Sequence, residues 1–506
     1  MADKLLIIHG YSDGSTSFTG LGDFLVSKGQ YTRENVFYLD YSSMDDEATF
    51  RDFADKLDSD HRVRLGQQRV DVACHSTGSL VVRAWLALHA QRTRRRRLPD
   101  VPCPVHRLLC FAPANFGSDL AKLGQSFLGK FRTTFFNSHS RKTDFLESGK
   151  AVLQGLEPAS PFQWELSMYD LHDPTTYFNP KSKEDQRCYP FVFAAGEAYT
   201  GVEAKLLKER AMPGTDGTVR IPGTSLNTRG CSLDFREAGP QLVWWDPVKY
   251  ADIPFAVFAG FNHGTIINPQ QKDFAAPHGP GAMAVEALEN VEDLASYEAM
   301  AKRFTEVCEH NYTLMPTERQ AAYQQFFFRV RDDVDQIVDD YFIDFYVATR
   351  DERAHEELTL FFDENFEAKV TRHSAAPSHR VFLVNCSKLH EFHQRLIAAD
   401  ARLMVEITGA SALPDVRYEM SRFVAFDPAA DLKPGEPMLL NPNTTTLVDV
   451  VLNRRQADRL LVIKDCTLTV VVETAAPVAA QPSGRAELIG PKGTADRPLP
   501  DDAMLK

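Results

Sequence analysis

The stretch of this chain best suited to chemistry is residues 69–80, Arg-Val-Asp-Val-Ala-Cys-His-Ser-Thr-Gly-Ser-Leu. A β-branched run over 70–73 predicts a short buried strand, and the apolar pattern that follows the serine predicts a helix. A sharp strand-to-helix turn would lift the Ser76 hydroxyl clear of the backbone and aim the Thr77 amide at a developing negative charge. Such a turn needs small residues, and Cys74 is small although glycine is more usual there. The alternative is a buried strand followed by a helix capped by a serine or threonine.

A second segment, Leu-Leu-Ile-Ile-His-Gly-Tyr at residues 5–11, is suited to support that serine. Its apolar run has the length and composition of a buried parallel strand, which ends at His9 and Gly10. If the serine attacks an acyl group, the loop after this strand can place a second amide at the charge. We therefore predict an oxyanion hole made by the backbone N–H groups of Tyr11 and Thr77. The alternative is an ordinary strand-to-helix turn.

An acid and a base follow in an order that suits the serine. Asp216 lies in the turn Pro-Gly-Thr-Asp-Gly-Thr-Val-Arg, and His263 lies in a loop directly after an apolar strand predicted over 255–259. The order serine, aspartate, histidine is the one expected for a triad in which the histidine takes the serine proton and the aspartate orients the histidine. The alternatives are a turn role for Asp216, Glu197 as the acid, and His75 or His9 as the base.

The elements that would position these residues alternate along the first half of the chain. Apolar strands are predicted near 4–9, 35–39, 69–73, 106–112, 189–195 and 254–259, and helical patterns near 15–28, 47–58 and 77–91. Alternation of this kind predicts a mostly parallel sheet covered by helices on both faces, which is an α/β fold. We assign residues 1–280 to this catalytic domain.

Two insertions interrupt the predicted sheet. Residues 118–187 are long for a connection and rich in aromatic side chains, so we expect a cap or lid over the serine that accepts an acyl chain. The alternative is that these side chains only pack the insertion onto the sheet. A second insertion, 197–250, carries the acid loop and the pair Trp244-Trp245, which either borders the same pocket or belongs to the core.

The pattern of predicted helices and strands changes after residue 280. Helical patterns over 281–323 predict a connector, and period-2 strands over 324–473 predict an antiparallel, β-sandwich-like accessory domain. Residues 474–506 are rich in alanine, proline and glycine and predict a flexible tail. No nucleophile, base or metal set stands out in the accessory domain, so we expect it to bind a protein partner or a substrate surface, or to brace the lid.

Composition narrows the function classes. The 506 residues are 43% hydrophobic and 25% charged, and the net charge of −13 argues against a general nucleic-acid surface. No apolar run of about 18 residues could span a membrane, and no leader pattern is evident. We therefore expect a cytoplasmic protein, with export by a signal-independent route left open. The eight cysteines lack paired spacing and predict reduced thiols, and we expect neither a metal nor a cofactor.

Taken together, the motifs resemble the α/β-hydrolase superfamily, in its lipase-like branch. The matching segments are His9-Gly10-Tyr11, residues 74–78, Ala-Pro-Ala-Asn-Phe-Gly-Ser at 112–118, Asp216-Gly217-Thr218-Val219 and Asn262-His263-Gly264. The resemblance covers about residues 4–275 and departs from the pattern at Cys74.

The resemblance implies a serine-dependent carboxylic-ester hydrolase that acts on a lipid or phospholipid ester through an acyl-enzyme, with peripheral membrane contact as a further expectation. The alternatives are a short-chain esterase or an acyltransferase with the same triad. From another class, the alternative is a non-catalytic binding or assembly protein on a hydrolase scaffold.

Overall fold

The structure is a computed structural model that describes residues 4–10, 18–39, 47–96, 101–123, 149–199, 214–236, 242–315, 322–366, 368–411, 416–428 and 439–456. All of these residues belong to one compact unit, Met1–Ala457. The predicted tail, the predicted strand over 466–472 and Tyr11 lie outside the described residues.

A six-stranded parallel sheet forms the core of the first part of the chain. Its strands are β1 (Leu5–Ile8), β2 (Val36–Leu39), β3 (Val70–His75), β4 (Val105–Phe111), β5 (Tyr189–Ala195) and β8 (Phe255–Phe258), in the order β2-β1-β3-β4-β5-β8. Every residue of β1, β3, β4 and β5 is buried, as expected for strands covered on both faces. The six strands predicted from the sequence are therefore confirmed. Their parallel pairing brings the loops that follow them to one edge, where ligands bind in open α/β sheets.

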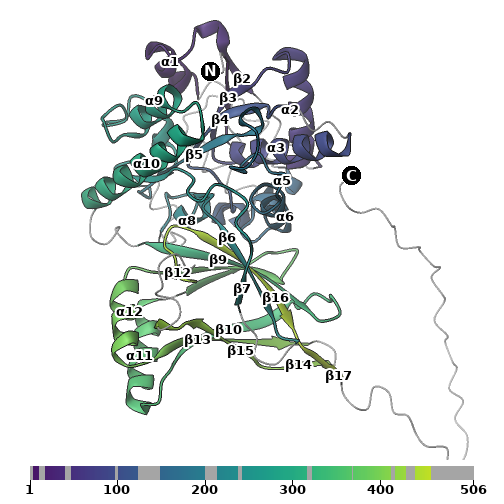
Figure 1. The fold of residues 1–506 in the computed structure, drawn as a ribbon, viewed down its shortest axis with the longest axis vertical. Coiled ribbons are helices and arrows are strands. Elements are labelled where there is room, and N and C mark those ends of the chain that lie inside the picture. Colours follow the sequence, from purple (N-terminus) through teal and green to yellow (C-terminus); the bar gives the residue numbers. More distant parts are fainter. Residues whose placement is uncertain are drawn as a thin grey trace, which may run out of the picture. The chain divides into compact units, whose positions relative to one another are not determined.

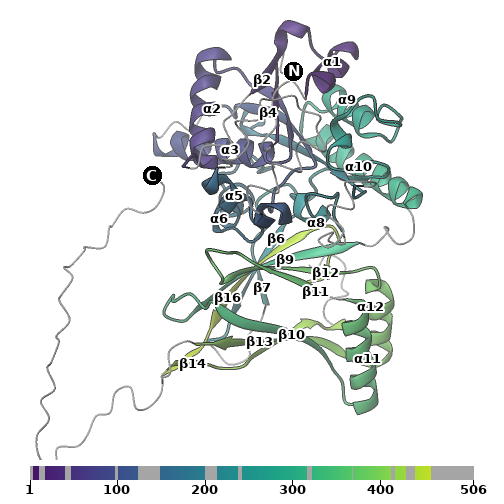
Figure 2. The same ribbon diagram turned by 180° about the vertical axis from the view of Figure 1, so that it is seen from behind.

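Helices cover both faces of this sheet (Figures 1 and 2). One side carries α2 (Phe50–Arg64) and α3 (Gly78–Arg95), and the other carries α1 (Thr19–Ser27), α9 (Pro280–Asn290) and α10 (Leu294–Leu314). Phe304 of α10 packs its ring against Phe191 and Phe193 of β5, so the helical residues after 280 cover this sheet. Short 3₁₀ turns lie at Arg33–Asn35, Asp119–Leu123, Glu184–Gln186 and Thr265–Ile267, and a short helix, α8, at Ile221–Thr224.

The described part of the predicted cap forms two helices, α5 (Lys150–Leu156) and α6 (Pro161–Asp170). Phe162 stacks on Phe50 of α2 with ring centroids 5.1 Å apart, and the Trp164 ring is 2% exposed. Phe162 and Trp164 therefore pack this segment onto the domain. Residues 124–148, which hold further aromatic side chains of the predicted lid, lie outside the described residues.

The second part of the chain is built on a mixed six-stranded sheet in the order β11-β12-β9-β16-β6-β7. Its strands are β6 (Arg229–Asp234), β7 (Leu242–Trp244), β9 (Tyr323–Asp332), β11 (Ala368–Arg372), β12 (His379–Asn385) and β16 (Thr445–Leu452). The expectation of a purely antiparallel arrangement is wrong at β16, which pairs in parallel with both β9 and β6. β6 and β7 precede β8 in sequence, so two strands of the second sheet come earlier in the chain than the last strand of the first sheet.

A three-stranded antiparallel sheet lies with the mixed sheet around a second hydrophobic core. It contains β10 (Asp340–Ala348), β13 (Arg402–Ala410) and β15 (Ser421–Phe426), and a two-stranded ribbon joins β14 (Val416–Tyr418) to β17 (Arg454–Gln456). Helices α11 (Glu352–Asn365) and α12 (Leu389–Ala398) share this core through contacts between phenylalanine rings. The tryptophan pair divides between the two cores: Trp244 packs on this one and Trp245 on the first.

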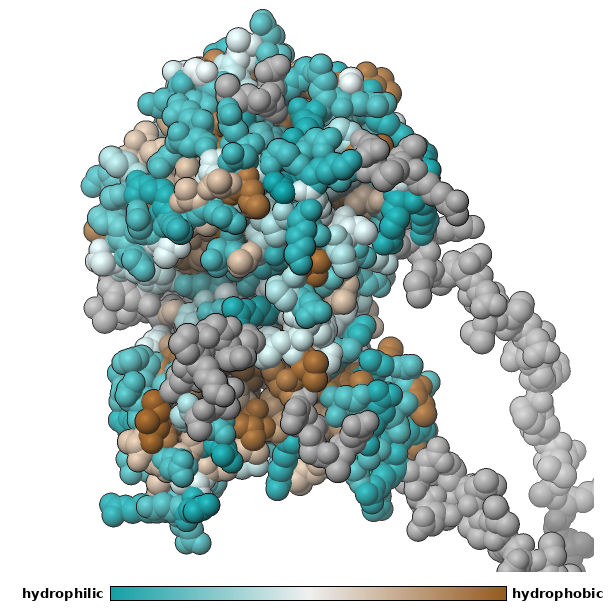
Figure 3. Space-filling view, in the orientation of Figure 1, coloured by the Kyte–Doolittle hydropathy of each residue, from teal (hydrophilic) through white to brown (hydrophobic). Residues whose placement is uncertain are grey.

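The face in Figure 3 is mostly hydrophilic, and its apolar side chains are scattered or grouped over the β-rich part. None of the described helices is long and apolar enough to cross a bilayer. The seven cysteines within the described residues are all free, and six of them are buried.

Candidate active site

Ser76 lies at the turn between β3 and α3, with backbone φ of 53°. This left-handed conformation is unusual for a residue with a side chain and has to be held by its surroundings. Here the Ser76 amide donates to the Phe111 carbonyl at 3.1 Å, and its carbonyl accepts from Ala114 N at 3.0 Å. A Cβ atom at Gly78 would lie 2.8 Å from the His9 carbonyl oxygen, so only glycine lets α3 begin this close to β1. The predicted elbow is therefore formed.

His263 and Asp216 are joined by a buried hydrogen bond. The Nδ1–H of His263 donates to Asp216 Oδ2 at 2.8 Å, and the side chains are 4% and 1% exposed. The other carboxylate oxygen accepts from the amides of Thr218 and Val219 at 2.9 and 2.8 Å. The two main chains are also joined, because His263 N donates to the Asp216 carbonyl at 3.2 Å. These contacts fix both the position of the carboxylate and the tautomer of the imidazole.

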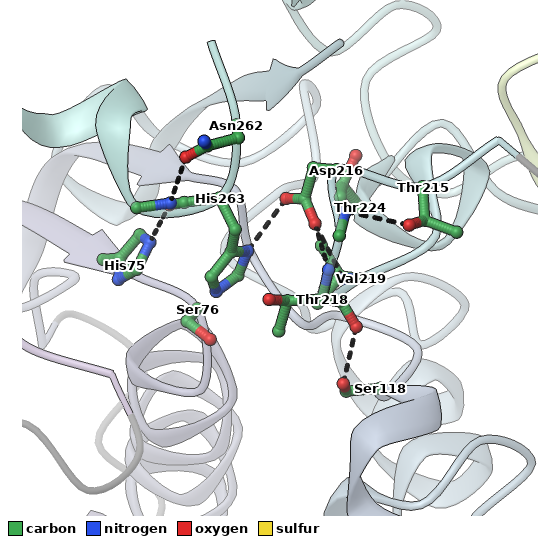
Figure 4. Close-up of polar contacts among 12 residues, drawn as sticks. His75, Ser76, Ser118, Thr215, Asp216, Thr218, Val219, Thr224, Asn262 and His263 are labelled. Carbon is green, nitrogen blue, oxygen red and sulfur yellow. Dashed lines mark hydrogen bonds and ion pairs between the residues drawn. The ribbon is translucent and has the colours of Figure 1, made fainter. Parts of the chain in front are cut away.

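Ser76 lies beside the ring nitrogen of His263 that faces away from Asp216 (Figure 4). Between these two described residues no hydrogen bond joins the hydroxyl to the imidazole. Catalytic hydrogen bonds are often long without substrate and tighten in its complex, so the arrangement suits proton transfer from Ser76 to His263. The structure therefore brings the three predicted triad residues together from three separate loops.

Comparison with known proteins supports the fold. No family model matches the chain, and no curated protein sequence matches it. The structure of phospholipase PlaB from Legionella pneumophila superposes with a TM-score of 0.73 at 22% identity, covering 92% of this chain and 97% of PlaB. The structure of PlaB in complex with thio-NAD gives a TM-score of 0.72 at 21% identity over the same shares of both chains.

The chain has the α/β-hydrolase fold. The β-rich second part is included in the match, since 92% of the chain superposes. Within this fold, Ser76 follows β3, the acid loop follows β5 and His263 follows β8.

Of the two backbone N–H groups predicted to form the oxyanion hole, that of Thr77 belongs to a described residue and that of Tyr11 does not. Thr77 is the residue from which α3 starts, so its amide lies next to Ser76 at the positive end of the helix. Tyr11 lies outside the described residues, and its role stays a prediction. The residues before it, His9 and Gly10, end β1 beside the elbow, since Gly10 lies against Ser76 and His75.

The rival acid and bases make other contacts. Glu197 accepts from the Gly260 amide at 3.2 Å. His9 donates from Nδ1 to the Gly10 carbonyl at 2.6 Å. Since a carbonyl oxygen can only accept, Nε2 of His75 carries a proton, which it donates to the His263 carbonyl at 2.8 Å. These contacts favour Asp216 and His263 over their rivals.

His75 has a supporting position that the sequence did not reveal. Its ring lies 4.6 Å from the His263 ring, between centroids, and 5.6 Å from that of Phe18. Burial and the neighbouring His263 lower the pKa of His75 well below its usual value, so the ring is neutral. A neutral ring can hold the His263 backbone without placing a second positive charge beside the base.

The segment 112–118 supports the acid loop. Ser118 Oγ donates to the Thr218 carbonyl at 2.6 Å, and Phe116 N donates to the Gly223 carbonyl at 3.0 Å. Arg220, four residues after the acid, is 3% exposed and forms a two-pronged ion pair with Asp119. The sequence named these segments but carried no signal that they meet.

Cys74, the departure from the usual motif, contacts the neighbouring strand β4. Its Sγ lies 3.6 Å from Sγ of Cys110 on the neighbouring strand, and the residue is 1% exposed. Burial raises the pKa of the Cys74 thiol well above its usual value, so it stays protonated. Among the described residues, no group of three histidine, cysteine, aspartate or glutamate side chains is arranged to hold a metal ion.

Proposed function

We propose that this protein is a serine-dependent hydrolase of carboxylic esters, with lipid or phospholipid esters as its substrates. The observation that carries the proposal is the 2.8 Å hydrogen bond between His263 and Asp216 behind a serine at a left-handed strand-to-helix turn. A serine hydroxyl is a weak nucleophile unless a base takes its proton and donors stabilise the oxyanion. A serine at such a turn, with His263 and Asp216 at the same edge of the sheet, has a base that can take its proton.

The proposed mechanism follows from the hydrogen bonds. Ser76 Oγ attacks the ester carbonyl while His263 Nε2 takes its proton, and the buried Asp216 carboxylate stabilises the resulting imidazolium. The amides of Thr77 and Tyr11 stabilise the tetrahedral oxyanion. His263 then gives the proton to the leaving alcohol oxygen, which leaves an ester of the acyl group on Ser76. A water molecule, deprotonated by the same imidazole, attacks that ester. The bond between the acyl carbon and Ser76 Oγ then breaks, the imidazolium returns the proton to Ser76 Oγ, and the carboxylic acid leaves.

The choice of a lipid substrate rests on the structural neighbour, which is named a phospholipase and superposes over 92% of this chain. A short-chain esterase would use the same residues, and so would an acyltransferase that admits an alcohol in place of water. These alternatives differ in the acyl group and the acceptor, which can be measured directly.

The experiment compares wild-type protein with Ser76→Ala and His263→Ala on two substrates, phosphatidylcholine vesicles and a soluble p-nitrophenyl butyrate. We expect free fatty acid from the vesicles, and a loss of about 10³-fold or more in each variant. Release of fatty acid that is unchanged in Ser76→Ala would refute the proposal. Turnover of the butyrate alone would assign a short-chain esterase, and transfer of the acyl group to an added alcohol would assign an acyltransferase.

A further inference from the structure

We infer that the β-rich second part of the chain is a working component of the catalytic site, because it holds the loop that carries Asp216. Thr371 of β11 is the positioning residue, and it acts through Arg220. This inference rests on the proposed function, since it assigns a role to residues around the proposed acid. It differs from the docking role expected from the sequence, because it concerns the chemical step itself.

The acid loop is a closed structure with Arg220 at its base. Thr215 and Arg220 form a β-bridge on either side of Asp216, and Ile221 N donates to the Gly214 carbonyl at 2.8 Å. Inside this bridge, Asp216 N donates to the Val219 carbonyl at 3.1 Å. A shift of Arg220 therefore moves the backbone that sets the position of the carboxylate.

Arg220 ties this loop to both parts of the chain. Its Nε and Nη2 donate to the two Asp119 carboxylate oxygens at 2.8 Å each, on the side of the first sheet. Its Nη2 also donates to Thr371 Oγ1 at 2.7 Å, on β11 of the second sheet. Arg220 and Thr371 are 3% and 8% exposed, so water does not readily replace either partner.

Two further contacts seat the same segment on the second sheet. Gly214 has a φ of 65°, and a Cβ atom there would lie 2.4 Å from the Tyr323 ring at the start of β9. Thr445 of β16 donates from Oγ1 to the Pro222 carbonyl at 3.0 Å. The segment from Gly214 to Pro222 thus meets three strands of the second sheet, β9, β11 and β16, at three separate points.

A neighbouring contact supplies a matched control. Ser374, three residues after Thr371, donates from Oγ to Glu157 Oε2 at 2.6 Å and from its amide to Oε1 at 2.8 Å. This pair joins the same segment of the second part to the residue after α5, and its hydrogen bonds and ion pairs with other described residues do not involve the acid loop. Loss of the Ser374 hydroxyl therefore weakens the packing of the two parts without touching the support of Asp216.

The experiment measures kcat and KM on the soluble butyrate ester for Thr371→Val, Thr371→Ser and Ser374→Ala. A small displacement of a catalytic group costs up to about 100-fold, and Arg220 keeps its Asp119 pair, so we expect Thr371→Val to lower kcat by about tenfold. Because Asp216 acts on the proton transfer and not on substrate binding, KM should change by less than about twofold. Thr371→Ser, which keeps the hydroxyl, should restore kcat, and Ser374→Ala should keep kcat within about twofold of wild type.

Thermal unfolding separates this role from a general loss of stability. We expect similar midpoints for Thr371→Val and Ser374→Ala, because each loses one hydroxyl contact at the same interface. The inference is overturned if Thr371→Val and Ser374→Ala have the same kcat, or if the loss in Thr371→Val lies in KM alone. If Thr371→Val unfolds early, Thr371→Ser decides, since a serine variant with the kcat of the valine variant also overturns it. Failure of the proposed function is distinguishable, because wild-type activity would then persist in Ser76→Ala.

Discussion

Replacing Asp216 by asparagine is the sharpest test of the acid. The side chain would keep its shape, and its amide oxygen could still accept from the amides of Thr218 and Val219, now at 2.9 and 2.8 Å from Oδ1. The other end, however, would present an N–H₂ group to His263 Nδ1 in place of an acceptor at 2.8 Å. The imidazole would have to turn Nδ1 into an acceptor and carry its proton on Nε2, which faces Ser76. It could no longer take the serine proton.

The wrong tautomer and the loss of charge should together lower kcat by about 10⁴-fold, or about 5 kcal/mol of transition-state stabilisation. The free energy of unfolding should fall less, by about 1.5–3 kcal/mol, because one charge-assisted hydrogen bond is lost and the shape is kept. Steady-state hydrolysis of the soluble butyrate ester measures the first quantity, and urea unfolding the second.

Glu197→Gln is the matched control, because it makes the same chemical change in the rival acid, which contacts Gly260 instead of His263. It should stay within about threefold of wild-type kcat. The reasoning fails if Asp216→Asn keeps more than about a tenth of wild-type kcat, or if Glu197→Gln is equally damaging.

Three further predictions concern the surroundings of the site. Cys74→Gly should keep wild-type kcat but lose about 1–3 kcal/mol of unfolding free energy, since a buried thiol that contacts Cys110 is removed from a strand. A large loss of kcat in folded protein would contradict this. His75→Phe should lower kcat about tenfold because the His263 carbonyl loses its hydrogen-bond donor, whereas His75→Gln should keep most of the activity. Equal kcat values for the two variants would refute the role of His75 in holding the His263 backbone. Burial lowers the pKa of His106 and of His393 to about 4, so between about pH 6.5 and 4 the unfolded chain binds protons that the folded chain does not. The free energy of unfolding, measured with urea, should therefore fall as the pH drops through this range, and a flat profile would contradict this.

Much of the first sheet and the order of the site could be predicted because the signals are local. Each of the six strands is a short apolar run, and parallel strands covered on both faces read as such runs. The serine, aspartate and histidine each follow a strand, and that position alone placed them at one sheet edge. Chain order is therefore enough to predict the base and the acid.

The parts that sequence did not predict depend on contacts between distant segments. Nothing in residues 229–234 shows that they pair with β16, more than 200 positions away, since the pattern of a strand does not identify its neighbour. The same limit hid the pairing of Arg220 with Asp119 and Thr371. For the same reason the aromatic side chains of α6 allow two interpretations, because burial against Phe327 and contact with a ligand produce the same sequence pattern.

The most direct test of the central claim is the site of covalent labelling by a fluorophosphonate, read by mass spectrometry of the intact protein and its peptides. The account predicts one adduct on Ser76 in wild-type protein, its absence in Ser76→Ala, and much slower labelling in His263→Ala. A folded wild-type protein that takes no label, or a label that persists at the same rate in Ser76→Ala, would contradict it.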